Sequence, residues 1–312
     1  MLNTSNATMY PEAQNNEQLA DDFSIFFKTK ISKISTSFQN SNKTIPDVDI
    51  SNEPQCESVL QAFRPVTHDE VKRYILSTPS KTYILDPFPT DLLKKCVDEV
   101  SPFITKLVNR SLEQGYMPKQ LKRAIVTPIP KKINSIEFSN FRPISNLPFL
   151  SKLIERITIN QLSEYCEENN LEEPYQSAYR RGLSTETALL KITNELLLNM
   201  DNQNISLLVL LDMSAAFDTI PHDLFLSRLE HTFGLSGSAL EWFKSYFKDR
   251  YQRIMVNGEM SREIELEIGL PQGSGAGPFG YKAYTKPIGH LIRSLLLDIA
   301  YHMQPHFKIA QP

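Results

Sequence analysis

The chain has 312 residues, of which 41% are hydrophobic and 22% are charged, and its formal net charge at pH 7 is −3. This length and apolar content allow one large domain or two ordinary domains with a substantial core. The slightly acidic total excludes a uniformly basic nucleic-acid-binding protein, although local basic patches remain compatible with it.

The cysteine content and the hydropathy indicate the compartment. The three cysteines, Cys56, Cys96 and Cys166, are widely spaced and odd in number, so neither a disulfide nor a zinc framework is expected. No stretch approaches the roughly 18 consecutive apolar residues of a membrane-spanning helix, and residues 1–18 lack the pattern of a secretory signal. We therefore expect a cytoplasmic or nuclear protein that is neither secreted nor membrane-embedded.

Residues 1–60 are expected to form a polar and linker segment that contains one helix. Residues 1–16 are polar, whereas residues 19–38 carry apolar side chains at helical spacing. Residues 39–57 have the Asn, Ser, Pro and Asp content of a linker. Order is expected to resume at Thr67, which has the spacing of a capping box with Glu70.

Periodicity and turn signals predict further elements along the chain. Helices are predicted at 101–113, 147–169, 184–200 and 221–232, and a short strand at 124–129. The pair Asn257-Gly258 lies between two strand-like runs, 253–256 and 264–268, and favours a type I′ hairpin turn. Together these elements predict an α+β fold in which a small sheet is backed by helices.

An apolar run in residues 207–211 stops abruptly at an acid. Five consecutive aliphatic residues fit a strand that is buried on both faces, and Asp212 is the first side chain able to leave the sheet edge. A carboxylate at that position can bind magnesium, which takes oxygen ligands. The alternative is an Asp that only ends the strand or caps the next helix.

Two further segments offer groups that suit phosphates or bases. Residues 269–278 form a glycine-rich turn whose backbone can approach a bulky ligand closely, and Gln272 supplies a hydrogen-bonding side chain there. Residues 140–146 contain Arg142, whose planar guanidinium is suited to gripping phosphate. Taken alone, either segment could be an ordinary loop.

Two segments are locally basic although the net charge of the chain is negative. The first contains Lys119, Lys122, Arg123, Lys131 and Lys132, and all of these except Lys131 are the candidate nucleic-acid contacts. The second patch, residues 242–253, mixes cations with aromatic residues, which can bind phosphates and stack on bases. Periodicity favours an amphipathic helix with a buried aromatic stripe and a solvated basic face, and both interpretations can hold together.

These segments, in this order, resemble the reverse transcriptases of non-LTR (LINE-type) retrotransposons. The resemblance runs from about Phe63 to about Ile292 and is carried by the motifs DPFPTDLLKKC (86–96), PKQLKRAIVTPIPKK (118–132), SNFRPISNLPFLSKLIERI (139–157), YQSAYRRGLSTETALLKI (175–192), LDMSAAFDTIPHDLFLSRL (211–229) and GLPQGSGAGP (269–278). It implies the fingers and a partial palm of a right-handed polymerase over 61–292, a divergent C-terminal tail over 293–312, and no thumb.

The resemblance implies a two-metal site. Asp212 corresponds to the catalytic acid that ligates both magnesium (or manganese) ions, and the carbonyl of Met213 corresponds to a further ligand. The implied reaction is in-line attack of a primer 3′-oxygen on the α-phosphate of a nucleotide. Asp218 is instead expected to cap or orient the next helix, which Pro221 would start well.

The resemblance also implies a nucleotide site. Arg142, and more weakly Lys131, are similar to the cations that grip the triphosphate. Phe217 looks like the aromatic residue that lies beneath the incoming sugar and discriminates against a 2′-hydroxyl, with a core aromatic as the alternative. Gln272 and Gly273 look like the residues that pack against the template base and the nascent pair.

The last part of the chain departs from the family pattern. The family supplies further carboxylates from an Asp-Asp pair in a hairpin after the glycine-rich segment, and no such pair follows Gly269 here. The one acid after Glu267 is Asp298, which is more simply interpreted as a surface or cap residue. Glycines within 275–280 stand where the family has a compact apolar helix. The sequence therefore predicts a truncated copy.

The predicted function is the RNA-directed DNA polymerase domain of a non-LTR retrotransposon, with an RNA template, a DNA primer and deoxynucleotides as partners. One alternative is a catalytically inactive fragment that binds nucleic acid, which the missing Asp-Asp pair favours. Another is a helical interaction protein without a nucleic-acid role. An incomplete palm sheet would also leave an apolar edge open to self-association.

Overall fold

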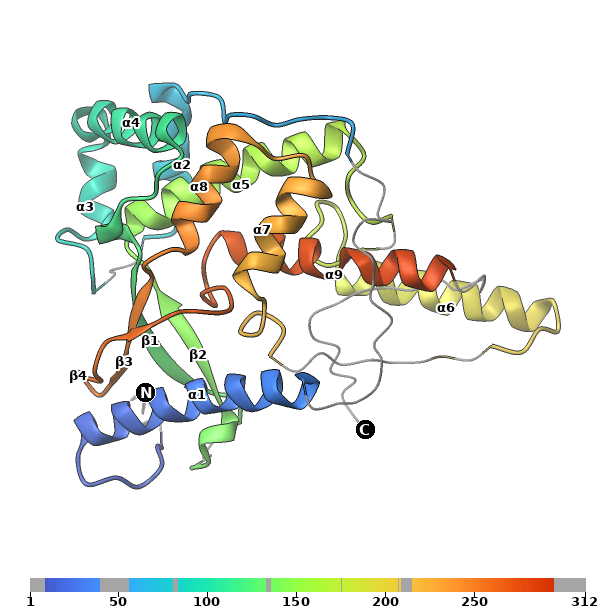
Figure 1. The fold of residues 1–312 in the computed structure, drawn as a ribbon, viewed down its shortest axis with the longest axis horizontal. Helices are drawn as coiled ribbons and strands as arrows, with labels where there is room; N and C mark the ends of the chain where they lie inside the picture. The colour runs from blue at the N-terminus through green and yellow to red at the C-terminus, as the bar shows by residue number, and fades with distance from the viewer. Residues whose placement is uncertain are drawn as a thin grey trace, which may run out of the picture.

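A small mixed β-sheet extends from a group of helices and is crossed by the long helix α1 (Asn16–Gln39) in the computed structural model (Figure 1). The structure describes residues 9–39, 56–80, 84–132, 136–174, 176–206, 208 and 215–294. The fold is mixed α/β, in keeping with the small sheet and the helices that the sequence predicts.

The sheet joins two parts of the chain that lie far apart in sequence. Its strands are β1 (Arg123–Pro130), β2 (Phe141–Asn146), β3 (Tyr251–Val256), β4 (Glu259–Met260) and β5 (Ile264–Glu265). The order is β2-β1-β3-β4, and β5 also pairs with β3. β1 runs antiparallel to β2 and parallel to β3, so β2 is an edge strand.

The predicted hairpin turn is confirmed. Asn257 and Gly258 have φ angles of 50° and 91°. The flanking pair Val256 and Glu259 lie opposite each other in the β3–β4 ladder. Positive φ at both central residues is the requirement of a type I′ turn, which explains why an Asn-Gly pair occurs at this place.

Local capping signals set the starts of two helices. The helices after α1 are α2 (His68–Ser77), α3 (Thr90–Lys95), α4 (Val97–Gln114), α5 (Phe149–Glu168), α6 (Thr185–Asp201), α7 (His222–His231), α8 (Gly237–Phe247) and α9 (Ala276–Ser294). The Thr67 hydroxyl accepts a hydrogen bond from the Glu70 amide at 3.2 Å, and the Glu70 carboxylate accepts one from the Thr67 amide at 2.8 Å. Ser184 and Thr187 form the same reciprocal box ahead of α6. The predicted capping box and the predicted helix entry at Ser184 are therefore confirmed.

The main core lies among the helices and contains the aromatic residues of the second basic patch. Trp242 and Tyr246 of α8 are fully buried, and their rings stack at 5.3 Å with an interplanar angle of 18°. The Trp242 indole donates a hydrogen bond to the Ser111 hydroxyl at 3.1 Å. The buried aromatic stripe is confirmed, but α8 ends at Phe247, and Arg253 lies on β3 instead of on a helical face.

A second, smaller core lies between α1 and the sheet. Phe23 of α1 is fully buried against Phe141 of β2, with ring centroids 5.0 Å apart. Ile254 and Val256 of β3 belong to the same cluster. Tyr10 stacks on Phe141 at 5.7 Å, so part of the segment expected to be only polar contributes to packing. Helix α1 thus packs on the sheet and shares a core with it.

The glycines near residue 280 do not prevent a helix. Helix α9 contains Gly277 and Gly280, and a β-carbon on Gly280 would lie 2.0 Å from Cδ1 of Leu270. Since Leu270 is buried, the glycine leaves the space that this leucine occupies. Among the described residues, none of the helices is both long and apolar enough to cross a bilayer.

Candidate functional site

The glycine-rich loop covers the outer edge of β2. The Ser145 amide donates a hydrogen bond to the Gln272 carbonyl at 2.7 Å. Gly273 follows with φ +107°, and a β-carbon there would lie 3.0 Å from the Ser145 carbonyl oxygen. The sequence therefore uses glycine where the loop must pass close to the strand.

The same loop is tied to the segment that carries Phe217. The Leu270 amide donates to the Phe217 carbonyl at 2.8 Å, and Gln272 Nε2 donates to both Asp218 carboxylate oxygens at 2.8 and 3.0 Å. Gly269 has φ +87°, and a β-carbon there would lie 2.6 Å from the Asp218 carbonyl oxygen. The structure therefore brings Arg142's strand, Phe217 and Gln272 into one neighbourhood.

Asp218 differs from its expected role. No side-chain hydrogen bond caps α7, which begins after Pro221, and the Asp218 carboxylate instead accepts hydrogen bonds from Gln272. Burial raises the pKa of Asp218, while the hydrogen bond from Gln272 and the positive charges of Lys30 and Lys131 oppose that rise. Asp218 is thus a poorly solvated carboxylate that orients the amide of Gln272.

Phe217 belongs to a cluster of aromatic rings. Its ring lies 5.7 Å from the ring of Tyr281 on α9 and 6.3 Å from the ring of Tyr179. Gly277 of α9 lies beside it, and a β-carbon there would make ordinary contact with the Phe217 ring at 3.8 Å. Phe217 is only partly buried, so it combines features of a packed aromatic residue and of a surface available to a ligand.

The two predicted phosphate-gripping cations lie on the β1–β2 hairpin. Arg142 is opposite Ile129 in the ladder and is half-buried. Within the described ranges, the Arg142 side chain has no hydrogen-bond or ion-pair partner. The Lys131 ammonium donates to the Ser139 carbonyl at 2.7 Å, close to the turn of the hairpin. Arg142 is therefore the more available of the two cations.

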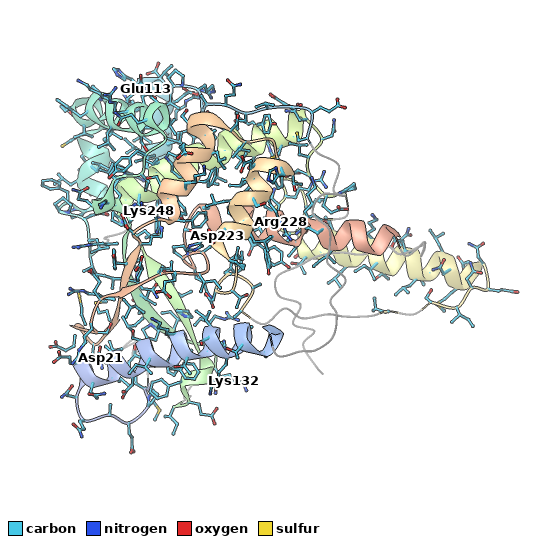
Figure 2. The ribbon with its side chains drawn as sticks, viewed as in Figure 1. Asp21, Glu113, Lys132, Asp223, Arg228 and Lys248 are labelled. Carbon is cyan, nitrogen blue, oxygen red and sulfur yellow. The ribbon has the colours of Figure 1, made fainter. Side chains whose placement is uncertain are left out.

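The four predicted nucleic-acid contacts occupy different environments. Lys119 pairs with Asp249 at 3.3 Å, and Arg123 pairs with Glu263 at 3.7 Å, but both cations are well exposed. Lys132 is exposed and lies near α1, far from Lys248 at the opposite end of the sheet (Figure 2).

Lys122 is not on the surface. It is 2% exposed, and its ammonium donates hydrogen bonds to the carbonyls of Ser245 and Lys248 at 2.9 and 2.6 Å. These carbonyls lie at the C-terminal end of α8, where a cation also complements the helix dipole. Burial lowers the pKa of Lys122. This placement argues against a phosphate contact and for a structural role.

The predicted catalytic residue and its neighbour, Asp212 and Met213, lie outside the described residues, as does the strand predicted at 207–211 apart from Leu208. In the part of the chain that the structure describes, no three His, Cys, Asp or Glu side chains converge in a way that could hold a metal ion. The described donors alone therefore do not make a metal centre.

Sequence reasoning missed a buried ion pair beneath the glycine-rich loop. Glu155 of α5 and Arg250 lie 3.6 Å apart, and both side chains are buried. The Glu155 carboxylate also accepts a hydrogen bond from the Gly275 amide at 2.8 Å, at the start of α9. Burial raises the pKa of Glu155, and the charge of Arg250 opposes that rise. No local pattern signals such a pair, because charged residues are usually exposed.

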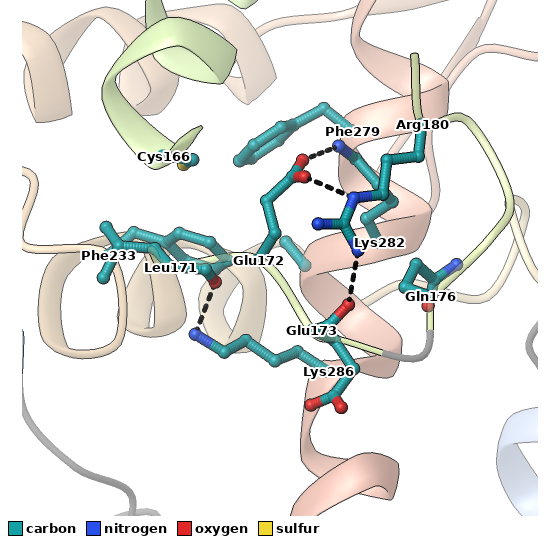
Figure 3. A pocket seen from close by; sticks show the side chains of 11 residues that line it. Cys166, Leu171, Glu172, Glu173, Gln176, Arg180, Phe233, Phe279, Lys282 and Lys286 are labelled. Atoms are coloured by element: carbon teal, nitrogen blue, oxygen red, sulfur yellow. Dashed lines mark hydrogen bonds and ion pairs between the residues drawn. The ribbon is translucent and has the colours of Figure 1, made fainter. Parts of the chain in front are cut away.

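A separate small pocket lies beside α9 (Figure 3). Glu172 stands between Lys282 and Arg180, at 2.5 and 3.0 Å, and the Lys286 ammonium donates to the Leu171 carbonyl at 2.7 Å. Glu172, Lys282, Arg180 and Lys286 thus have partners around the pocket, which indicates structural packing between α9 and the loop after α5.

Comparison with known proteins agrees with the motifs. The model of the reverse transcriptase (RNA-dependent DNA polymerase) family matches residues 129–303, more than half of the chain. Three similar proteins come from Drosophila melanogaster.

The first is the probable RNA-directed DNA polymerase from transposon BS, 28% identical over 93% of this chain and 31% of that protein. The second, the RNA-directed DNA polymerase from mobile element jockey, is 29% identical over 75% of this chain and 26% of that protein. The third, the probable RNA-directed DNA polymerase from transposon X-element, is 28% identical over 74% of this chain and 26% of that protein.

The chain thus spans about a third or less of the length of these relatives. The family match and the assembled motifs lead to one assignment. The chain belongs to the reverse transcriptase family, as an RNA-directed DNA polymerase domain of the non-LTR retrotransposon type.

Proposed function

We propose that this chain supplies the fingers and a partial palm of a polymerase and binds a nucleotide beside the β1–β2 hairpin. The observation that carries the proposal is the hydrogen-bonded path from Ser145 through Gln272 to Asp218. It joins three segments that are separated in sequence and that the family resemblance assigns to one nucleotide site. A site assembled by backbone and side-chain hydrogen bonds can position a ligand without large rearrangement.

Arg142 is the proposed triphosphate grip. Its guanidinium is half-exposed, and no described residue engages it. A planar guanidinium can donate two parallel hydrogen bonds to a phosphate, a geometry that lysine lacks. Lys131 contributes a second positive charge near the turn of the same hairpin.

Gln272 and Gly273 are the proposed contacts for the template base. Gly273 is exposed, and Gln272 is held from both sides, through its carbonyl by Ser145 and through its amide by Asp218. A clamped loop presents its backbone in one geometry, which suits stacking against a base pair. Phe217 is the proposed floor beneath the sugar.

The metal assignment rests on sequence. We propose that Asp212, with the carbonyl of Met213, holds magnesium or manganese. The described residues form no metal site of their own. When bound, such a cation would neutralise phosphate charge and polarise the reacting phosphoryl group. The resemblance implies that further metal-binding carboxylates come from an Asp-Asp pair, and no such pair follows Gly269 in this sequence.

The exposed cations Lys119, Arg123 and Lys132 are the proposed contacts for an RNA template and a DNA primer, and Lys122 is left out because it is buried. Contacts of this kind read charge and not sequence. The family relationship and the three free thiols support an intracellular location, cytoplasmic or nuclear.

Primer extension on an RNA template tests the polymerase function. The purified chain and Asp212→Ala are compared with magnesium and all four deoxynucleotides. Extension that Asp212→Ala abolishes supports polymerisation. If a folded chain gives no extension but binds the duplex and a deoxynucleotide, the supported function is binding without polymerisation.

A binding assay tests the surface directly. Affinity for the primer–template should fall with salt, and Lys132→Ala should flatten the salt dependence. Lys106→Ala is the matched control, because Lys106 is an exposed lysine on α4, away from the hairpin. An affinity that does not depend on salt, or equal changes in the salt dependence of the two variants, would contradict the proposed surface.

A further inference from the structure

Tyr179 forms one wall of the aromatic cluster around Phe217. The Tyr179 ring meets Phe217 edge to face at 6.3 Å and 74°, and it meets Tyr281 in the same way at 6.0 Å and 74°. Phe217 and Tyr281 complete the triangle at 5.7 Å and 34°. Each ring therefore touches the other two, although the residues come from three distant segments of the chain.

The three rings differ in exposure. Tyr281 of α9 is 2% exposed, whereas Tyr179 is 43% exposed. Tyr179 therefore stands at the open side of the cluster. An aromatic residue that only filled the core would be expected to bury more of its ring.

Tyr179 also has an unfavourable backbone. Its φ angle is +57°, in the left-handed region that bulky L-residues rarely adopt. Gly182, three residues later, also has a positive φ angle, +77°, but glycine adopts this conformation without strain. Strained non-glycine residues gather at ligand sites, where the surrounding structure holds a side chain in a particular position. Here the residue with the unfavourable backbone is also the one whose ring meets Phe217 edge to face.

Discrimination at a sugar needs a wall that cannot move. A 2′-hydroxyl is small, so a single phenylalanine ring that can turn aside would admit it. The rings of Tyr281 and Tyr179 both contact the Phe217 ring, and such contacts restrict its movement. Edge-to-face contacts fix the orientation of a ring as well as its position.

We propose that Tyr179 is a specificity-determining residue, which holds Phe217 in place and forms a second wall of the pocket for the nucleotide sugar. The proposal rests on the nucleotide site proposed above and extends it from Phe217 to a residue in the loop before α6. It assigns to Tyr179 the preference for a 2′-deoxy sugar over a ribose, and not the affinity for the triphosphate.

The test compares two affinities in one assay that does not need polymerisation. A fluorescent deoxynucleotide bound to the protein–primer–template complex with manganese is displaced by dATP or by ATP, and the ratio of the two affinities is measured. Tyr179→Leu should lower the preference for dATP by about two- to tenfold, the range for losing one edge-to-face ring pair. Tyr179→Phe keeps the ring and should keep the preference.

The matched control is Tyr116→Leu. Tyr116 is 42% exposed, close to Tyr179 in exposure, but it follows α4 and touches no ring of the cluster. A merely structural role for Tyr179 would lower the melting temperature and weaken both nucleotides equally. An unchanged dATP-to-ATP ratio in Tyr179→Leu would overturn the inference while leaving the nucleotide site intact. If the wild-type complex binds no deoxynucleotide, the proposed site itself fails, and the inference fails with it.

Discussion

Gln272 and Asp218 are joined by two hydrogen bonds from one amide nitrogen, at 2.8 and 3.0 Å, in a place where the carboxylate is poorly solvated. The pair links the glycine-rich loop to the Phe217 segment, so its protonation state bears on both. Because burial is the largest effect on the pKa of Asp218 and raises it, the charged form is the one that the folded state disfavours.

Asp218→Asn should therefore stabilise the protein at neutral pH and have less effect in acid. A carboxyl whose folded pKa is raised destabilises the folded state above that pKa. The penalty disappears as the pH falls through the raised pKa toward the ordinary value of 3.8, because the folded state then takes up the proton. Melting temperatures of both proteins between pH 4 and pH 8 give the measurement. A benefit that grows toward acid would contradict the expected sign.

Two glycines of α9 should respond oppositely to alanine. Gly280→Ala places a β-carbon against buried Leu270 and should destabilise by about 1–3 kcal/mol, the usual range for overpacking. In Gly277→Ala the added β-carbon makes only ordinary contacts of 3.6 Å or more. This variant should be more stable than wild type by up to about 1 kcal/mol, because alanine favours a helix more than glycine does. Urea unfolding of the two variants makes the comparison. Equal effects would mean that the Leu270 contact does not govern this helix.

Lys122 and Lys132 should separate stability from nucleic-acid binding. Lys122→Met removes the donor to two carbonyls at the end of α8 and should destabilise by about 1–3 kcal/mol. Lys132→Met, at an exposed site, should stay within about 0.5 kcal/mol of wild type. Only Lys132→Met should reduce the salt slope of duplex binding, by roughly 0.7–0.9 for one lost phosphate contact. A reduced slope in folded Lys122→Met would show that the buried position is wrong.

The start of α2 should be acid-sensitive. Thr67→Ala removes a cap and should destabilise the protein by about 1 kcal/mol.

The hydrogen bond from Arg64, followed by that from the Thr67 amide, lowers the pKa of Glu70 from 4.5 to about 2. The contribution of the Glu70 carboxylate is therefore present above pH 4.5 and is lost as the pH falls toward 2. Glu70→Gln should be less stable than wild type at pH 7 and equal to it near pH 2, as measured by thermal unfolding.

The structural features that were predictable have causes within a few residues. The cap at Ser184 depends on Thr187, and the turn at Asn257 depends on Gly258, so each signal is complete in a short window. Gly280 and Glu155 were not predictable in the same way. The glycine depends on Leu270 and the glutamate on Arg250, and only the folded chain brings these partners together.

The candidate site divides along the same line. Motif order indicated that Arg142, Phe217 and Gln272 belong together, and the structure places their segments side by side. Composition also grouped Lys122 with Lys132, because both lie in one basic run, but Lys122 is buried against carbonyls at the end of α8 and Lys132 is exposed. The role of Tyr179 depends on a backbone angle, which no spacing rule reveals.

The position of α1 on the sheet has a consequence for synthesis of the protein. Ile254 and Val256 share a core cluster with Phe23, yet they leave the ribosome about 215 residues after α1 is complete, or roughly 10 to 45 seconds later at ordinary elongation rates. During that interval the aromatic face of α1 lacks its β3 partners. Until β3 emerges, this face of α1 can therefore associate with other apolar surfaces.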